Sequence, residues 1–139
     1  MKRPERSALD PALRERFDRL LEEVLDELPD DVLDLLEECP LVVDDEPSER
    51  TLRQMRIGDR DYLCGLYTGI PLTDRSVEHS GVLPDRVQVF RRGVVAAARA
   101  RKGHVSDRRL KRQIRITVLH EIGHHFGLDE DDLRELGYE

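Results

Sequence analysis

The stretch DRRLKRQIRITVLHEIGHHFG, residues 107–127, carries the longest helical pattern of the chain. Its side chains repeat at intervals of three and four residues, which places one set on a single helix face. Ser106 and Asp107 can cap the N-terminus of such a helix, and Gly127 suits the left-handed position that follows a helix C-terminus. The sequence therefore predicts a helix over about 107–126. The residues of its one-sided set are Leu110, Ile114, Thr117, Val118, Ile122 and Phe126.

Two histidines lie one turn apart near the end of this helix. His120 and His124 are four residues apart, so they share a face and could bind one metal ion through two imidazole nitrogens at about 2 Å. Glu121 lies beside them, within reach of a water held on that metal. This HExxH arrangement combines two ligands with a general base. A zinc ion lowers the pKa of its water toward about 7, and the carboxylate takes the proton as the water attacks a carbonyl.

A third ligand is expected after the helix, because catalytic zinc usually has three protein ligands and one open position. Gly127 allows a sharp turn, and Glu130 completes H-E-x-x-H-x-x-G-x-x-E, with an acid where metzincins have a third histidine. Three extended residues span about 10 Å, enough to return to the metal. Glu130 is therefore the favoured ligand. Asp131 and Asp129 are alternatives, since any carboxylate oxygen is acceptable to zinc.

Composition limits the other classes of function. The chain has 139 residues and a net charge of -7, which favours one domain and argues against general nucleic-acid binding. Two cysteines, Cys39 and Cys64, are too few for a disulfide scaffold; free thiols are expected, although the two could also pair. No secretory signal and no apolar run of about 18 residues is present, so we expect a soluble, cytoplasmic protein without a membrane span.

The rest of the chain predicts helices around a few short strands. Helices are expected over 11–28, 30–38, 94–102 and 130–136, strands over 41–43, 62–67 and 85–92, and loops over 47–61 and 69–84. This order predicts an α+β fold in which a small β-sheet packs on helices. The domain would span 1–139, with N-terminal helices over 1–38 and a core over 41–136.

Several other side chains could serve such a site. His125 points about 100° away from the two ligand histidines, so we expect it to support them or to lie at the surface. Tyr67 and Tyr138 could stabilise an oxyanion, and His79 could polarise a substrate carbonyl from the long loop. Cys64 is expected to be a buried structural thiol rather than a nucleophile.

The N-terminal half of the 107–126 helix is rich in basic residues. These could contact an acidic partner, although such a run is more often a solvated face. The residues are Arg108, Arg109, Lys111, Arg112 and Arg115.

The segment HEIGHHFGLDEDDL resembles the active helix of the small bacterial zincin-like metallopeptidases, the mini-zincins. Upstream, GLYTGIPLTDRSV (65–77) and LPDRVQVFRR (83–92) are similar to the loop and strand that precede the metal helix in that family, so the resemblance covers roughly residues 41–136. It implies a minimal zincin-like domain with one zinc ion per chain, bound by His120, His124 and the acid at 130, with Glu121 as the base. The third ligand in this group is often aspartate, which keeps Asp131 in consideration.

The resemblance also has departures. The methionine turn of metzincins is absent, because Met1 and Met55 both precede the motif. Few residues follow His124, so we expect a shallow cleft that a protein partner could complete. In zincins an extended substrate pairs with an edge strand beside the metal, and the strand over 85–91 is our candidate. Its substrate-binding residues would be Arg86, Val87, Gln88 and Val89.

Together the motif and the resemblance predict a zinc-dependent metallopeptidase that hydrolyses a peptide or protein substrate through a metal-bound water. The alternative is a non-catalytic zinc-binding module for protein interaction. The fourth metal position separates the two hypotheses, because it is open in an enzyme and filled by protein in a structural site. Asp131 or Tyr138 could fill it.

Overall fold

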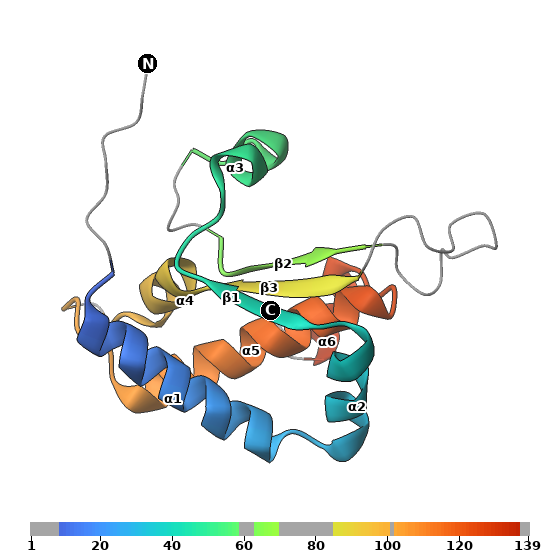
Figure 1. The fold of residues 1–139 in the computed structure, drawn as a ribbon, viewed down its shortest axis with the longest axis horizontal. Helices are drawn as coiled ribbons and strands as arrows, with labels where there is room; N and C mark the ends of the chain where they lie inside the picture. Colours follow the sequence, from blue (N-terminus) through green and yellow to red (C-terminus); the bar gives the residue numbers. More distant parts are fainter. Residues whose placement is uncertain (1–8, 59–62, 70–84, 101, 137–139) are drawn as a thin grey trace.

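The computed structural model describes residues 9–58, 63–69, 85–100 and 102–136. Within these ranges the chain forms helices around a short mixed sheet (Figure 1), which confirms the predicted α+β fold. The elements follow one another as α1 (Pro11–Glu27), α2 (Asp30–Glu38), β1 (Leu41–Asp44), α3 (Glu49–Met55), β2 (Gly65–Thr68), β3 (Arg86–Phe90), α4 (Arg91–Ala98), α5 (Asp107–His125) and α6 (Glu130–Leu136).

The sheet has the strand order β1-β3-β2, with β1 parallel and β2 antiparallel to β3. Strand β3 is thus the central strand, and its expected role as a substrate-binding edge is wrong. Its backbone groups already pair on both sides, so they are not available for a peptide. Two of the four residues assigned to substrate, Val87 and Val89, are fully buried. The same correction applies to Arg86 and Gln88, because their assignment as substrate-binding residues also required β3 to be an edge strand. Among the described residues, the edge next to α5 belongs to β2.

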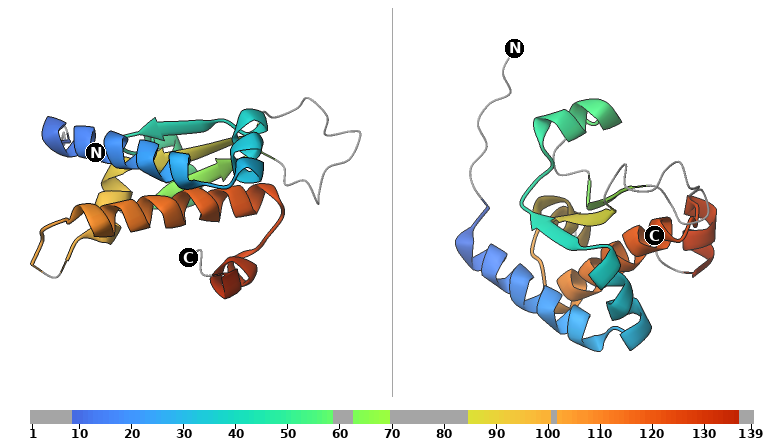
Figure 2. Two further views of the ribbon diagram at one scale, coloured as in Figure 1. Left: turned by 90° about the horizontal axis from the view of Figure 1, so that it is seen from below. Right: turned by 45° about the vertical axis from the view of Figure 1, so that its right-hand side comes forward.

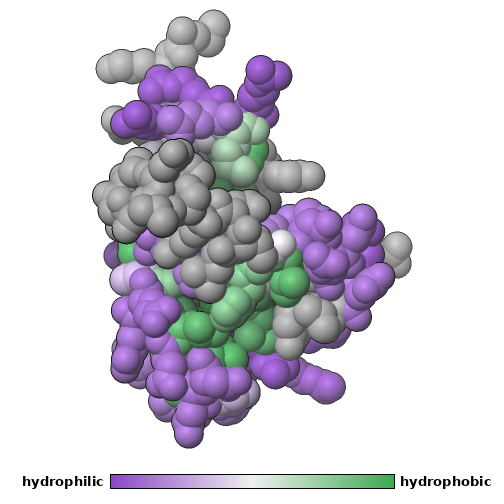
Figure 3. Space-filling model, turned by 90° about the vertical axis from the view of Figure 1, so that its right-hand side faces the viewer, coloured by the Kyte–Doolittle hydropathy of each residue, from purple (hydrophilic) through white to green (hydrophobic). Residues whose placement is uncertain are grey.

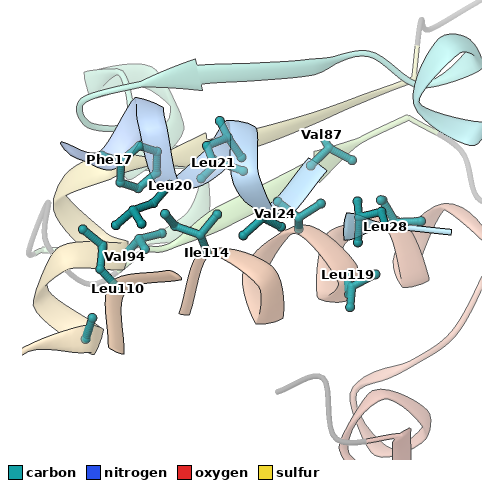
Figure 4. Close-up of a cluster of buried hydrophobic side chains, with 14 of the residues drawn as sticks. Phe17, Leu20, Leu21, Val24, Leu28, Val87, Val94, Leu110, Ile114 and Leu119 are labelled. Atoms are coloured by element: carbon teal, nitrogen blue, oxygen red, sulfur yellow. The ribbon is translucent and has the colours of Figure 1, made fainter. Parts of the chain in front are cut away.

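Helices α1 and α5 lie side by side against one face of the sheet (Figure 2). Their facing sides are apolar at helical spacing, so they form the main core together with β3 and α4 (Figure 4). Asp10 caps α1 by accepting a hydrogen bond from the Ala12 N–H, and Pro11 occupies the first helical position. The fully buried side chains of this core include Phe17, Val24, Val87, Val89, Val94, Leu110, Ile114 and Val118.

Two elements differ from the sequence prediction. The polar stretch expected as a loop contains α3, which Ser48 caps by accepting a hydrogen bond from the Thr51 N–H at 3.1 Å. This helix lies on the opposite side of the sheet from α1 and α5 (Figure 1) and buries Leu52 completely. Helix α4 begins at Arg91, three residues earlier than expected. There Arg91 forms ion pairs at 2.9 Å with both Asp18 and Asp45, which ties the start of α4 to α1.

Helix α2 covers the end of the core without burying any residue completely. Its apolar side chains are half-buried, because they pack against the core on one side only. On the face where α2 comes forward, Figure 3 shows an apolar area between hydrophilic margins. No described helix combines the length and the apolar composition that crossing a membrane requires.

Candidate metal centre

The last turn of α5 ends in a motif that redirects the chain toward its own histidines. Gly127 has φ +81°, the left-handed conformation that was expected after the helix. Its N–H donates to the carbonyl of His124 at 2.9 Å, and the N–H of Leu128 donates to that of Gly123 at 3.1 Å. This pair of bonds is a Schellman motif, which satisfies the terminal carbonyls and sharply turns the chain. Helix α6 then begins at Glu130.

The turn brings three candidate ligands together. The Nε2 atoms of His120 and His124 are 3.2 Å apart. The Glu130 carboxylate lies beside both, with Oε1 3.1 Å from Nε2 of His124 and Oε2 3.4 Å from Nε2 of His120. A side chain from the start of α6 thus completes the triangle begun by two side chains of α5. Their candidate ligand atoms all lie within 4.8 Å of one another.

The neighbouring acids have other roles. The Asp129 carboxylate accepts a hydrogen bond from the Asp132 N–H at 2.9 Å, and the Asp132 carboxylate accepts one from the Asp129 N–H at 3.0 Å. This reciprocal pair caps the N-terminus of α6. Asp131 is highly exposed and forms an ion pair with Arg134 at 3.2 Å. Of the three acids considered from the sequence, the structure therefore places Glu130 against the histidines.

The chemistry of this triangle fits a zinc ion. Ligand atoms held at about 2.05 Å from a tetrahedral zinc ion are separated from one another by about 3.3 Å. The two imidazole nitrogens are 3.2 Å apart, and Oε1 of Glu130 is 3.1 Å from Nε2 of His124, so both distances are close to this value. The Nδ1–H of His124 donates to the Leu128 carbonyl at 3.1 Å, which leaves Nε2 as the lone-pair nitrogen of the neutral ring. The partial negative charge at the C-terminus of α5 also favours a cation there.

Glu121 is buried immediately beside the triangle. Only 7% of the residue is exposed, and the backbone N–H of Tyr67 donates a hydrogen bond to its carboxylate. Burial raises the pKa of Glu121, and the nearby imidazoles and the N–H of Tyr67 offset this only in part. A base whose pKa is raised toward the working pH transfers protons more effectively than an ordinary carboxylate.

Strand β2 lies directly on α5 at this point. A Cβ at Gly65 would come within 2.9 Å of Thr117 Cγ2 and 3.0 Å of Glu121 Cγ, so a side chain there would displace the glutamate. Glycine therefore allows β2 to approach closely enough for its backbone to bond to Glu121. The hollow in front of the candidate ligands has a volume of about 520 Å³, and β2 forms one of its walls with Gly65, Leu66 and Tyr67.

A polar cluster behind the ligands was not found from the sequence. His125 is 2% exposed, and its Nδ1 lies 2.9 Å from Oδ2 of Asp85, which is itself buried. The hydroxyl of Tyr67 is 3.4 Å from the same nitrogen, and the two rings meet edge to face. His125 was expected to support the site or to lie at the surface, and the structure buries it. The sequence offered no signal for Asp85 as its partner.

The structure gives no catalytic role to the other residues that were considered from the sequence. Tyr67 lines the hollow, but its hydroxyl points to His125. Burial raises the pKa of the Cys64 thiol, so it stays protonated and is a poor nucleophile at neutral pH. Neither Cys39 nor Cys64 forms a disulfide. His79 and Tyr138 lie outside the described residues.

The comparison with known proteins agrees with this site. A family model described as a zincin-like metallopeptidase matches residues 36–138, which include the whole candidate metal centre. The chain therefore belongs to the zincin-like metallopeptidase family, and the predicted resemblance is confirmed. A search of the curated proteins found no match. Helix α1 precedes the matched residues, yet it packs on α5 in the same core.

Proposed function

We propose that this protein is a zinc-dependent peptidase in which His120, His124 and Glu130 bind one zinc ion and Glu121 is the general base. The observation that carries the proposal is the convergence of two imidazole nitrogens and the Glu130 carboxylate within 4.8 Å of one another, with the buried carboxylate of Glu121 beside them. Family membership supports the same reaction class. When bound, zinc would supply Lewis acidity toward both the substrate carbonyl and the attacking water.

Proton transfer and support of the site would be provided by side chains and backbone groups of the protein. Glu121 would accept a proton from the attacking water and then pass it to the leaving amine. The N–H of Tyr67 holds this carboxylate in place, and the burial of Glu121 keeps its proton affinity high. Asp85 and His125 support the adjoining turn from behind. The site thus combines a base of raised pKa with a rigid backing.

Strand β2 is the proposed docking edge for an extended substrate. It pairs with β3 on one side, and in the described part of the chain no strand pairs with its other side. A peptide that added to this edge would lie along the wall of the hollow that contains the candidate ligands. This assignment replaces the earlier one to β3 and keeps the same physical principle of β-augmentation.

The first test measures metal content and peptide hydrolysis on the same preparations, made without chelators. The wild-type protein and the Glu121→Gln variant should both hold about one zinc ion per chain, because Glu121 is not a ligand. His120→Ala should lose most of the zinc. The Glu121→Gln variant should cleave a peptide library at least about 10²-fold more slowly than the wild type. Full activity in this variant would refute the mechanism.

The rival hypothesis is a non-catalytic zinc-binding module that recruits a protein partner. The group of candidate ligands has three members within the described residues, which favours an open fourth position and hence an enzyme. Zinc binding without any hydrolysis, combined with a partner complex that dissolves when zinc is removed, would favour the module instead.

A further inference from the structure

A trough leads away from the candidate metal centre along α5. Next to the hollow in front of the ligands lies a second one of about 220 Å³, and both are lined by Leu63, Gly65, His120 and Glu121. A third hollow of about 210 Å³ follows. It shares Gln113 and Ile116 with the second. Each hollow thus shares lining residues with the next, so the three form a row along α5.

The row follows a single face of α5. Residues three and four apart on a helix share a face, and the α5 residues that line the hollows keep this spacing. They run back from the metal ligands toward the N-terminus of the helix, where α4 lies beside it (Figure 1). These residues are His124, Glu121, His120, Thr117, Ile116, Gln113, Arg112 and Arg109.

The far end of the trough is basic. Arg109 and Arg112 line the third hollow together with two alanines of α4. Arg109 is held in place, since its guanidinium donates to the carbonyls of Ala98 at 2.9 Å and Arg99 at 3.3 Å. Arg112 is exposed, and in the described part of the chain its side chain forms no hydrogen bond or ion pair. A positively charged end on a chain of net charge -7 attracts a carboxylate selectively.

The length of the trough sets the position of that carboxylate. Arg112 precedes His120 by two helical turns, and eight residues at 1.5 Å each correspond to about 12 Å. An extended peptide advances about 3.3 Å per residue. The charge on a bound peptide would therefore lie about four residues from the cleaved bond.

The direction of β2 decides whether the charged residue of the peptide lies N-terminal or C-terminal to the cleaved bond. Leu63 and Gly65 line the second hollow, whereas Tyr67 and Gly69 line only the first, so the start of β2 faces the basic end. Antiparallel pairing is more stable per residue than parallel pairing. A substrate antiparallel to β2 runs from Gly69 toward Leu63, which carries its C-terminal part into the trough.

From this geometry we propose that the trough is an extended substrate subsite that selects a carboxylate about four residues C-terminal to the cleaved bond, with Arg112 as the specificity-determining residue and Arg109 as its support. The proposal rests on the proposed peptidase function. It adds a substrate class to that function, namely peptides with an acidic C-terminal flank.

The test maps cleavage sites in a peptide library digested by the zinc-loaded protein. Aspartate and glutamate should be enriched three to five residues after the cleaved bond. Arg112→Glu should abolish this enrichment. The matched control is Arg115→Glu, which makes the same charge change on the same helix at a residue that lines none of the three hollows. It should leave the enrichment intact.

Synthetic peptides then identify the source of the carboxylate. Replacing glutamate by glutamine at the fourth position should lower kcat/KM by up to about fivefold, the scale of a partly exposed ion pair. A peptide that ends at that position with a free carboxylate is compared with its amide. If kcat/KM falls only in the peptide amide, the subsite binds the C-terminal carboxylate of the substrate. If kcat/KM falls only in the glutamine peptide, the subsite binds an acidic side chain.

The outcomes separate this inference from the function on which it rests. Cleavage without acidic enrichment, or the same enrichment in Arg112→Glu, would overturn the subsite and leave the peptidase standing. If the zinc-loaded wild type cleaves nothing, the peptidase proposal fails and the subsite fails with it.

Discussion

The two halves of α5 bury very different side chains. In the N-terminal half, Leu110 and Ile114 are completely buried and apolar. In the C-terminal half, the buried set includes Glu121 and His125, a carboxylate and an imidazole. Burying polar groups costs free energy unless they are paired, so the two halves cannot contribute equally to stability.

The difference indicates that one half of α5 stabilises the fold and the other half contains the candidate metal site. The apolar half holds α5 against α1, and ion pairs such as Lys111–Glu27 join the same two helices at the surface. The polar half departs from the apolar pattern where the candidate ligands lie. Departures from a consistent pattern are expected at functional sites, where local stability is reduced. Substitutions in the two halves should therefore have separable effects.

The largest effect on folding should come from Ile114→Ala. This substitution removes a fully buried side chain from the centre of the core and should lower the free energy of unfolding by about 2–5 kcal/mol. Zinc content should be unchanged at temperatures where the variant is folded, because Ile114 precedes His120 by more than one helical turn and does not line the hollow at the candidate ligands. Urea denaturation and elemental analysis measure the two quantities. A variant that loses zinc while still folded would show that the halves are not separable.

The next largest effect should come from the buried pair of Asp85 and His125. Asp85→Asn removes the charge that the imidazole faces at 2.9 Å and should cost about 1–3 kcal/mol. A double-mutant cycle with His125→Phe isolates the pair, and a coupling free energy of about 1 kcal/mol or more is expected for residues in direct contact. Additive effects of the two substitutions in urea denaturation would mean that the pair does not stabilise the turn.

In the metal-free protein, Glu121→Gln should not lower the free energy of unfolding, unlike the two substitutions above. Burying a carboxylate costs free energy, and under the proposed function this cost is accepted for the reaction, so a neutral isostere should keep the stability or raise it by about 1 kcal/mol. Thermal unfolding in the presence of a chelator measures the difference. A substantial loss of stability would indicate that the carboxylate serves the fold and not the reaction.

The same contrast explains how far the sequence could predict the structure. Helix α5, the left-handed Gly127 and the start of α6 depend on local signals, namely spacing, caps and glycine, and their predicted bounds were right to within one residue. The candidate ligands follow from the same local geometry. Helix α3 was missed because its seven residues bury only Leu52, which leaves too weak a periodic signal.

Features that depend on long-range contacts could not be predicted. The central place of β3 is set by pairing with β1 and β2, which lie far from it in the sequence. The partnership of Asp85 with His125 joins residues 40 positions apart, at the start of β3 and the end of α5. No local pattern encodes either relation, so the substrate edge was assigned to the wrong strand.

The smallest predicted effect concerns the first residue of α5. Hydrogen bonds from Arg16 and Arg19 of α1 lower the pKa of Asp107 below its usual value. A carboxyl group whose pKa is lowered in the folded state stabilises the fold above its unfolded pKa, and this contribution disappears as the pH falls through the lowered value. Asp107→Asn should therefore reduce stability near neutral pH, and the difference from the wild type should vanish in acid.

Salt and a matched variant sharpen this last prediction. The carboxylate of Asp107 is exposed, so added salt should also shrink the difference. Asp26→Asn removes an exposed acid of α1 that has no ion pair among the described residues, and it should produce no such loss. If the Asp107→Asn deficit persists unchanged from neutral pH into acid, the ion pairs with α1 do not cause it.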